Sequence, residues 1–489
     1  MANRARDVAL WLAPPALGLV LYWPGLMSWF QKDDFAWLGL RALVHNWHDL
    51  WWALFTPLAQ GTIRPLSERA FYLGFTWLFG LNPLPFHLCV FLTYVVTTVV
   101  LASVCTKLTG SRMAGFWAAI LWTVNGVLAV PLAWSPIYYE ILCSLVLLAS
   151  LWLLIRYDET GRSSFYWLQC AVFILGFGIL ELNVVYPALA AAYALCRAPR
   201  LLARVIPLFA ISAANALWHL HAAPLSSTGV YKMYWDASIL STLWTYWLYA
   251  LGPRRLMLIG MYSSTWRTLA TALLMAGLFV FLGWKLRRRE WVAALFPAWF
   301  LIVLSPLLPL RDHISDYYLT IPLIGLAMWG GWALAAGWNA GLAGKIVAVS
   351  LLSIYVSVSI PVGRATAVSF YNRSQDIRRM LESIVRQSRG QPGKTILLTG
   401  VAPDMFWSAL YHRPLRLYGI DDVYLMSGHP GIAIPEWQNE ETRNLFITPA
   451  MAEQALRENR AVVYDLANGV ARDVTAEYAP LPRVEVPGR

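Results

Sequence analysis

The fold class follows from residues 83–106, PLPFHLCVFLTYVVTTVVLASVCT, which contain no Asp, Glu, Lys or Arg. A membrane helix needs about 20 mostly apolar residues, so this stretch is long enough to cross a bilayer. The whole chain has the same character, because its 489 residues are 58% hydrophobic and 13% charged, whereas soluble domains are about 25% charged. This composition excludes a soluble enzyme, a disordered chain and a coiled coil, and it predicts a polytopic α-helical membrane protein.

Further apolar stretches give about eleven predicted transmembrane helices. They cover residues 8–29, 83–106, 113–132, 136–155, 165–181, 183–196, 203–221, 266–284, 291–309, 317–338 and 346–362. The first is long and rich in Trp, so we interpret it as an uncleaved anchor. Residues 237–260 are also apolar, but Arg254 and Arg255 interrupt them. We interpret them as a helix along the outer face, with a membrane crossing as the alternative.

Basic residues in alternate short loops predict which side of the membrane each loop faces. The loops predicted to face the cytoplasm carry Arg4 and Arg6; Lys107 and Arg112; Arg156 and Arg162; Arg197, Arg200 and Arg204; Lys285, Arg287, Arg288 and Arg289; and Lys345. They place the N-terminus in the cytoplasm, long outer loops at residues 30–82 and 222–265, and the C-terminus outside, in a multi-pass protein of the cell (inner) membrane. The first outer loop carries Trp47, Trp51 and Trp52, which predicts helices lying at the bilayer interface. These loops explain the net charge of +11, so we do not expect nucleic acid as a partner.

Charge density divides the chain into two predicted domains. Residues 1–363 hold 36 charged side chains, and residues 364–489 hold 29, a density ordinary for a soluble domain. In the second part, residues 373–389 predict an amphipathic helix and residues 395–398 and 461–466 predict strands. Asn468-Gly469 predicts a hairpin-type turn after the second strand. We therefore expect a membrane domain followed by a small α/β extracytoplasmic domain.

The acids of the predicted membrane domain lie mostly near its outer face, which is where we expect chemistry. Lys32-Asp33-Asp34-Phe35 directly follows the first span. The paired acids could be a polar stop at the membrane edge, a general base or a metal ligand. Adjacent helical residues point about 100° apart, so we expect only one of the two to face a site.

The paired acids, together with further motifs, resemble the GT-C superfamily of integral-membrane glycosyltransferases, in particular O-mannosyltransferases with tetratricopeptide repeats and their bacterial relatives. The similar stretches are Arg64-Pro65-Leu66, Phe79-Gly80-Leu81-Asn82-Pro83, Phe86-His87-Leu88, Trp134 with Glu140, Asp316-Tyr317-Tyr318-Leu319 and Ile321-Pro322-Leu323-Ile324-Gly325. Two features depart from the family pattern. A His-Pro pair is replaced by Asn125-Gly126, and no tetratricopeptide repeats follow the membrane part.

The resemblance implies a polyprenyl-phosphate sugar as donor and transfer to a hydroxyl on the outer face with inversion. The sugar, hexosyl or pentosyl, and the acceptor, a lipid, polysaccharide or protein, stay open. Asp33 or Asp34 is the expected base, with Asp33 favoured, and Arg64 the expected phosphate clamp. Further candidates for binding the phosphate, here called reserves, are Lys232, Arg255 and Arg311.

Further candidate substrate-binding residues are Glu140, Glu181, Asp312, His313, Asp316 and Tyr317. Asp312, His313 and Asp316 could bind a divalent cation or form a solvated turn, so a metal is left undecided. Glu181 could equally be a structural carboxyl near the water boundary. The alternative functions are a transporter or flippase of a lipid-linked or small solute, which should show internal repeats, and a non-catalytic scaffold.

Overall fold

The structure is a computed structural model that describes residues 2–58, 61–252, 264–426 and 442–478. The chain divides into two compact units. The first comprises Met1–Met27 and Val44–Phe370, and the second comprises Ser28–Leu43 and Tyr371–Arg489. The predicted boundary at 363/364 lies within one unbroken helix, and residues 28–43 belong to the same unit as the C-terminal domain.

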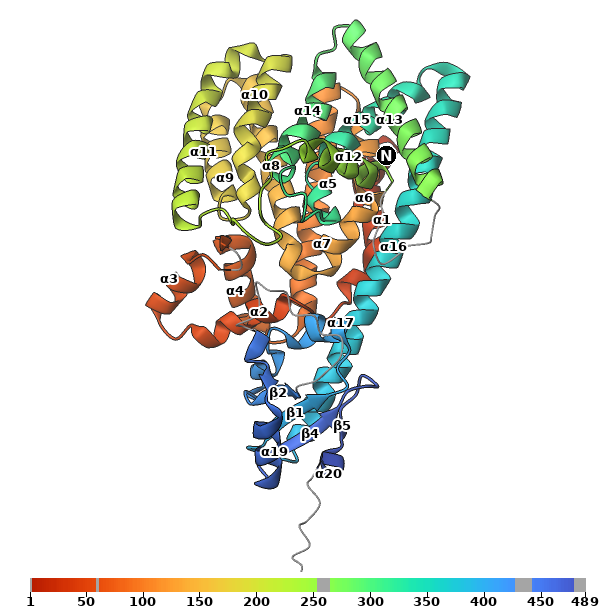
Figure 1. Cartoon of the computed structure of the whole chain (residues 1–489). Coiled ribbons are helices and arrows are strands. Elements are labelled where there is room, and N and C mark those ends of the chain that lie inside the picture. Colours follow the sequence, from red (N-terminus) through yellow and green to blue (C-terminus); the bar gives the residue numbers. More distant parts are fainter. Residues whose placement is uncertain (1, 59–60, 253–263, 427–441, 479–489) are drawn as a thin grey trace, which may run out of the picture. The chain divides into compact units, whose positions relative to one another are not determined.

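The first unit is a bundle of apolar helices (Figure 1). Among the described residues, five helices are long and apolar enough to cross a membrane, and a bent pair would make a sixth. The helices of the bundle are α1 (Ala2–Leu26), α5 (Pro83–Thr109), α6 (Arg112–Val124), α7 (Ala129–Ala133), α8 (Tyr138–Thr160), α9 (Ser163–Gly176), α10 (Tyr186–Arg197), α11 (Leu202–Ala222), α12 (Ser238–Leu251), α13 (Ser264–Arg287), α14 (Val292–Leu304), α15 (Leu323–Trp338) and α16 (Gly341–Ser388). Each predicted span overlaps helix, which confirms a polytopic helical fold. Among the described helices, five or six rather than eleven are long and apolar enough to cross a membrane.

The centre of the bundle is α6, which packs against α5 and α15. The span breaks after α6 with a bend of 56°. Asn125 stands at this break, where its side-chain Nδ2 donates to the Ala250 carbonyl at 2.9 Å and to the Tyr355 hydroxyl at 2.7 Å. The next residue, Gly126, packs so closely on α16 that a Cβ there would lie 3.0 Å from the Ser359 carbonyl oxygen. The Asn125-Gly126 departure from the family pattern therefore has a packing role.

Helix α16 has 48 residues and contains Pro361. The sequence predicted a span ending at 362 and a separate amphipathic helix from 373, but the structure has one helix. A proline is tolerated in a helix of this kind because neighbouring groups satisfy the freed carbonyl. Helix α12 has 14 residues, too few for an ordinary span. It begins at the predicted position, and Arg254 and Arg255 lie outside the described residues.

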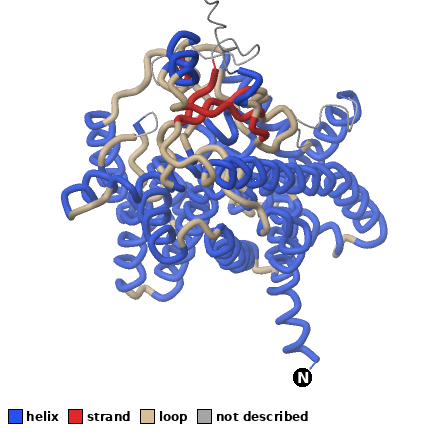
Figure 2. Tube along the Cα trace, turned by 90° about the horizontal axis from the view of Figure 1, so that it is seen from below, coloured by secondary structure: helices blue, strands red, loops and turns tan. Residues whose placement is uncertain are grey.

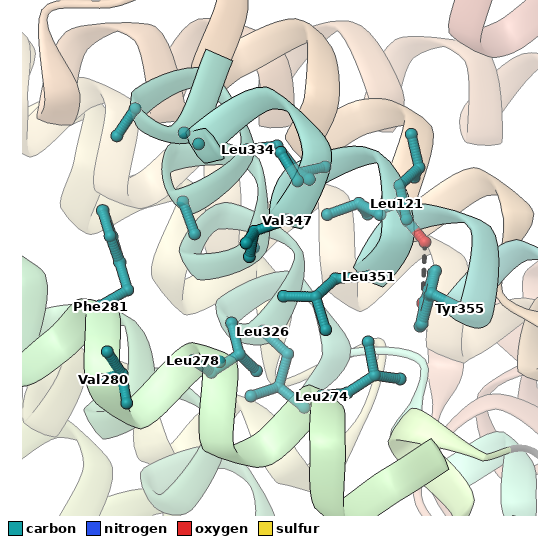
Figure 3. A pocket seen from close by; sticks show the side chains of 18 of the residues that line it. Leu121, Leu274, Leu278, Val280, Phe281, Leu326, Leu334, Val347, Leu351 and Tyr355 are labelled. Carbon is teal, nitrogen blue, oxygen red and sulfur yellow. Dashed lines mark hydrogen bonds between the residues drawn. The ribbon is translucent and has the colours of Figure 1, made fainter. Parts of the chain in front are cut away.

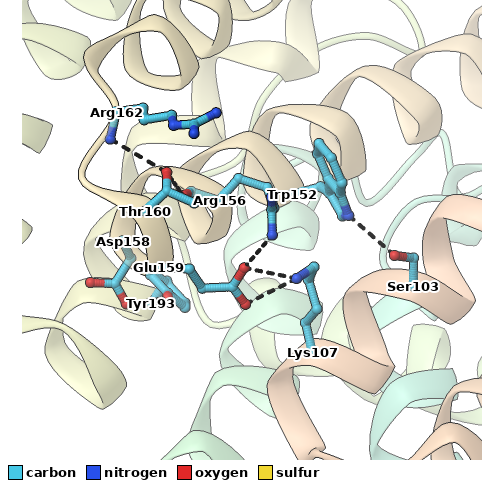
Figure 4. Close-up of polar contacts among 9 residues, drawn as sticks. All are labelled: Ser103, Lys107, Trp152, Arg156, Asp158, Glu159, Thr160, Arg162 and Tyr193. Atoms are coloured by element: carbon cyan, nitrogen blue, oxygen red, sulfur yellow. Dashed lines mark hydrogen bonds and ion pairs between the residues drawn. The ribbon is translucent and has the colours of Figure 1, made fainter.

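Charged residues at one end of the bundle pair with one another (Figure 4). Lys107 of α5 and Arg156 of α8 both bind Glu159, at 2.8 and 3.0 Å. Asp158 binds Arg200 at 2.6 Å and accepts a hydrogen bond from Tyr193. The charged residues among these belong to loops predicted to face the cytoplasm. Partly exposed pairs of this kind contribute little stability singly, so packing holds the bundle.

The first outer loop contains three helices, α2 (Asp34–Gly39), α3 (Trp47–Phe55) and α4 (Phe71–Phe79). Trp47 and Trp51 of α3 are exposed, as expected for a helix that lies at an interface. Arg69 is fully buried and holds the loop together, because its guanidinium donates to the carbonyls of Ala53, Thr56 and Thr62.

The second unit contains a five-stranded sheet in the order β3-β2-β1-β4-β5 (Figure 2). The strands are β1 (Thr395–Thr399), β2 (Val423–Met426), β3 (Phe446–Ile447), β4 (Ala461–Asp465) and β5 (Arg472–Asp473), with helices α17 (Pro403–Met405), α19 (Pro449–Arg457) and α20 (Thr475–Tyr478). The first four strands are parallel, and β5 is antiparallel to β4. Gly469, at φ +69°, lies in the turn between β4 and β5. The small α/β domain and its turn are confirmed.

Candidate functional site

The paired acids Asp33 and Asp34 have different surroundings in the second unit. Asp34 is 2% exposed, and its carboxylate accepts a hydrogen bond from the Gln31 backbone N–H at 2.9 Å. Asp33 is 53% exposed. The two neighbouring acids therefore differ in exposure, and the expectation that only one of them faces a site stays a prediction. Asp34 closes the turn by accepting the Gln31 N–H, and Asp33 lies exposed in the same turn.

The turn carrying Asp33 is attached to the C-terminal domain. The Lys32 backbone N–H donates to the Ser408 carbonyl at 2.7 Å, and Trp29 N–H donates to the Ser374 hydroxyl at 2.9 Å. Lys32 has a φ of +55°, a conformation that costs a non-glycine residue about 1–2 kcal/mol. Such backbone is kept only where surrounding contacts fix it. The position of Asp33 is therefore set by residues far along the chain.

His412 of the C-terminal domain completes this group. Its Nε2 lies 3.3 Å from Asp33 Oδ1, and its side chain is 26% exposed. An imidazole next to a carboxylate can orient it or exchange a proton with it. The His412 side chain was not among the predicted site residues, and no sequence spacing indicates it, because 379 positions separate it from Asp33.

Arg64, in the first unit, lies between two carboxylates. Its Nη1 is 2.7 Å from Glu68 Oε1, and its Nη2 is 2.9 Å from Glu181 Oε2. Glu68 stands on the π-helical turn Pro65–Ala70, four residues after Arg64. Glu181 is brought near because Leu66 N–H donates to the Gly178 carbonyl and the Ser67 hydroxyl donates to the Ile179 carbonyl. π-Helical turns occur frequently at functional sites.

Electrostatics tie these three residues together. Burial alone would lower the pKa of Arg64, but Glu181 and Glu68 outweigh it and hold that pKa well above its ordinary value. Burial raises the pKa of Glu68, and the charge of Glu181 adds to this, while Arg64 opposes it. Arg64 thus pairs with both carboxylates, and the three side chains together carry a net negative charge when Glu68 and Glu181 are both ionised. Any further anion would compete with a carboxylate for Arg64.

Aromatic and acidic side chains surround Arg64. Its guanidinium carbon is 4.1 Å from the ring centroid of Tyr139, a cation–π distance. Next to Tyr139 is Glu140, which is 2% exposed, in the first turn of α8. No described residue makes a hydrogen bond to Glu140 Oε2. Among the predicted residues, the structure therefore brings Arg64 and Glu181 into direct contact, and it places Glu140 directly after the Tyr139 that lies against Arg64.

Arg311 and Asp312 belong to a second group, and Asp316 contacts Tyr317. The Arg311 guanidinium lies 3.5 Å from the Tyr234 ring centroid and pairs with Asp236 at 3.2 Å and with Asp312 at 3.7 Å. This arrangement is partly exposed. The backbone N–H of Tyr317 donates to the carboxylate of Asp316 at 2.9 Å.

His313 packs among aromatic rings that include the neighbour of Tyr317. Its ring centroid is 4.3 Å from that of Tyr231 and 5.8 Å from that of Tyr318, which itself packs on Tyr317 at 4.8 Å. Burial lowers the pKa of His313 below its ordinary value. The reserve Lys232 lies 5.1 Å from the Tyr234 ring centroid, and the reserve Arg255 is outside the described residues.

A divalent cation does not fit the side chains found here. Within residues 2–58, 61–252, 264–426 and 442–478, no group of three or more His, Cys, Asp or Glu could hold a metal ion. Asp312 pairs with Arg311, and the Asp316 carboxylate accepts its neighbour's N–H. We therefore assign no chemical step to a metal.

Two site residues were missing from the prediction, and they differ in how they could have been found. Glu68 follows Arg64 at the i, i+4 spacing that lets oppositely charged side chains pair on a helix, so the sequence carried a signal. His412 carried none.

Comparison with solved structures supports the fold. The oligosaccharyltransferase of Archaeoglobus fulgidus, in complex with Zn and sulfate, is 9% identical, with 93% of this chain and 67% of that chain covered and a TM-score of 0.52. ArnT from Cupriavidus metallidurans, bound to undecaprenyl phosphate, is 15% identical. The match covers 95% of this chain and 96% of that chain, with a TM-score of 0.46. A third structure is the archaeal oligosaccharyltransferase AglB from Archaeoglobus fulgidus, in complex with an inhibitory peptide and a dolichol-phosphate. It is 11% identical, the match covers 95% of this chain and 69% of that chain, and the TM-score is 0.46.

The likeness at a TM-score of 0.52 shows that this chain shares the fold of that oligosaccharyltransferase, in agreement with the predicted polytopic helical architecture. No protein-family model and no curated protein matches the chain.

Proposed function

We propose that the protein is a membrane glycosyltransferase that moves a sugar from a polyprenyl-phosphate donor to an acceptor hydroxyl on the extracytoplasmic face. The fold of an oligosaccharyltransferase supports this proposal. The observation that carries it is the half-exposed carboxylate of Asp33, held in a fixed turn beside His412. Proteins stabilise such precise placement where a reacting group must be positioned.

Asp33 is the proposed general base. Its carboxylate takes the proton from the acceptor hydroxyl as the acceptor oxygen attacks the anomeric carbon. The bond from that carbon to the phosphate oxygen breaks, and the electron pair leaves on the polyprenyl phosphate. A single displacement of this kind inverts the anomeric centre. A phosphate leaving group needs little acid assistance, so one base and one cation suffice.

Arg64 is the proposed cation for the phosphate. Its guanidinium presents donors in a fork that suits phosphate oxygens. It already binds Glu68 and Glu181, so the donor phosphate must replace one carboxylate. Glu181 is the one to leave, because it is 32% exposed while Glu68 is 3% exposed. Glu68 then keeps the guanidinium oriented.

The test is sugar transfer by the purified full-length chain with Asp33→Asn. Loss of a general base should lower kcat by about 10²- to 10⁴-fold, with the amount of folded protein unchanged because Asp33 is exposed. Asp34→Asn is the matched comparison, since it alters a buried carboxylate that closes the turn. Full activity of Asp33→Asn would disprove the base assignment. Energy-dependent movement of a solute with no transfer product would favour a transporter instead.

A further inference from the structure

An apolar groove in the first unit lies far along the chain from the acids and Arg64. It has a volume of about 560 Å³ and lies between α13, α15 and α16 (Figure 3). Its lining includes Leu278, Phe281, Leu326, Leu334, Val347 and Leu351. Glycines 277, 330, 337 and 344 also line it, and they allow close packing around the groove, because a Cβ at any of them would lie 3.2 Å or less from a neighbouring atom. The hydroxyl of Tyr355, at one end, is occupied because it donates to the Leu121 carbonyl.

Cations gather at the other end of the groove. Arg288 lies over the ring of Trp284, a lining residue, with its guanidinium carbon 4.3 Å from the ring centroid. Lys345 directly follows the lining residue Gly344, and its Nζ is 5.4 Å from the ring centroid of Trp338. Arg287, Arg288, Arg289 and Lys345 are exposed. The nearby acid, Glu290, already binds Lys285 at 2.8 Å. This end therefore carries surplus positive charge.

The size of the groove limits what it can hold. Along α16 it extends from Ala343 to Tyr355, which is about 18 Å at 1.5 Å per residue. One leaflet of a bilayer has about 15 Å of hydrocarbon, half of the ~30 Å core. The length of the groove therefore matches an acyl chain of a membrane phospholipid within one leaflet.

We propose that this groove binds one acyl chain of an anionic phospholipid whose phosphate lies against Arg288 and Lys345. The apolar lining accounts for the chain, and the surplus positive charge accounts for the anionic head group. Basic residues at the end of a space between membrane helices bind anionic lipids in this way. The lipid belongs to the leaflet at the basic end of the bundle, which is the end predicted to face the cytoplasm.

Native mass spectrometry of the purified full-length chain tests the proposal, with dioleoyl phosphatidylglycerol and dioleoyl phosphatidylcholine as probes. Phosphatidylglycerol should bind about tenfold more tightly. The double variant Arg288→Gln, Lys345→Gln should remove that preference, while Arg162→Gln, at another exposed loop, should keep it. Ala343→Trp should block the groove and weaken phosphatidylglycerol binding about tenfold. Val349→Trp, on an exposed part of α16 outside the lining, should not.

Three results would overturn the proposal. Equal binding of the two lipids would show that the positive charge has no role. Unchanged phosphatidylglycerol binding in Ala343→Trp would place the lipid elsewhere. Displacement of phosphatidylglycerol by undecaprenyl phosphate at equimolar concentration would show that the groove serves a polyprenyl chain. If Ala343→Trp does not fold, the Arg288 and Lys345 double variant still decides, because both side chains are exposed.

Discussion

Glu181→Gln should tighten the binding of a polyprenyl phosphate. Glu181 accepts hydrogen bonds from Arg64 Nε at 2.9 Å and pairs with Nη2 at 2.9 Å, so it occupies the face of the guanidinium that a phosphate needs. Glutamine is nearly the same size but carries no charge. The substitution therefore removes a competing anion and leaves Arg64 in place, because Glu68 still holds Nη1 at 2.7 Å.

The expected size of the effect follows from these contacts. A hydrogen bond to a charged group contributes about 1.5–3 kcal/mol, which corresponds to roughly 10- to 150-fold in affinity. Glu181 is 32% exposed, and solvent screens such pairs. The lower end of the range, about tenfold, is therefore the expected gain.

The assay is a titration of undecaprenyl phosphate into the detergent-solubilised protein, followed by intrinsic tryptophan fluorescence. Glu159→Gln is the matched control, because Glu159 also binds two cations and is 35% exposed, but it belongs to the network around Lys107. An affinity that falls or stays the same in Glu181→Gln would refute the reasoning. It would mean that Glu181 contacts the donor or positions Arg64 for it.

Three further changes test the site and its support. His412→Gln should lower kcat by no more than about fivefold, because an exposed pair contributes ~0–1 kcal/mol; a loss as large as that of Asp33→Asn would make His412 itself the base. His313→Phe should flatten the acid side of the stability profile. Burial lowers the pKa of His313 below 6.5, so the unfolded state binds more protons than the folded state. The stability of the wild-type protein therefore falls as the pH drops through 6.5. If the thermal midpoint changes equally between pH 7.5 and pH 5 in the wild type and in His313→Phe, this reasoning is wrong. Ser374→Ala leaves the Trp29 N–H unpaired, at a cost of about 1–3 kcal/mol. The rate of amide hydrogen exchange at residues 29–34 should therefore rise about 5- to 150-fold, whereas the control Ser388→Ala should leave it unchanged. An unchanged rate in Ser374→Ala would refute the role of Ser374 in holding this turn.

The fold could be predicted because its signal is local. Long apolar stretches such as residues 83–106 mark helices independently of context, and the Asn468-Gly469 turn is defined by two adjacent residues. The break at Asn125 could not be predicted from local pattern. It depends on contacts with Ala250 and Tyr355, which lie 125 and 230 positions away.

The candidate site was only partly predictable for the same reason. Arg64, Glu140 and Tyr317 lie in the stretches that carry the resemblance, and Glu181 was expected as an acid at the end of a predicted span. The sequence did not indicate that Arg64 is shared between two carboxylates. Glu181 is 117 positions from Arg64. Hydrophobic patterning reports which side chains face lipid or core, whereas pairing between distant polar groups depends on the tertiary structure.

The acids of the first outer loop lead to Asp33 by elimination. Residues 30–82 contain four acids, Asp33, Asp34, Asp49 and Glu68. Asp34 is buried and closes a turn, Asp49 accepts the His45 N–H at the start of α3, and Glu68 is buried against Arg64. Each of these three is committed to a backbone group or a fixed cation. Asp33 alone combines exposure with a partner, His412, that can itself take up a proton. This contrast supports the proposal that Asp34 is a structural carboxylate and that Asp33 is the general base.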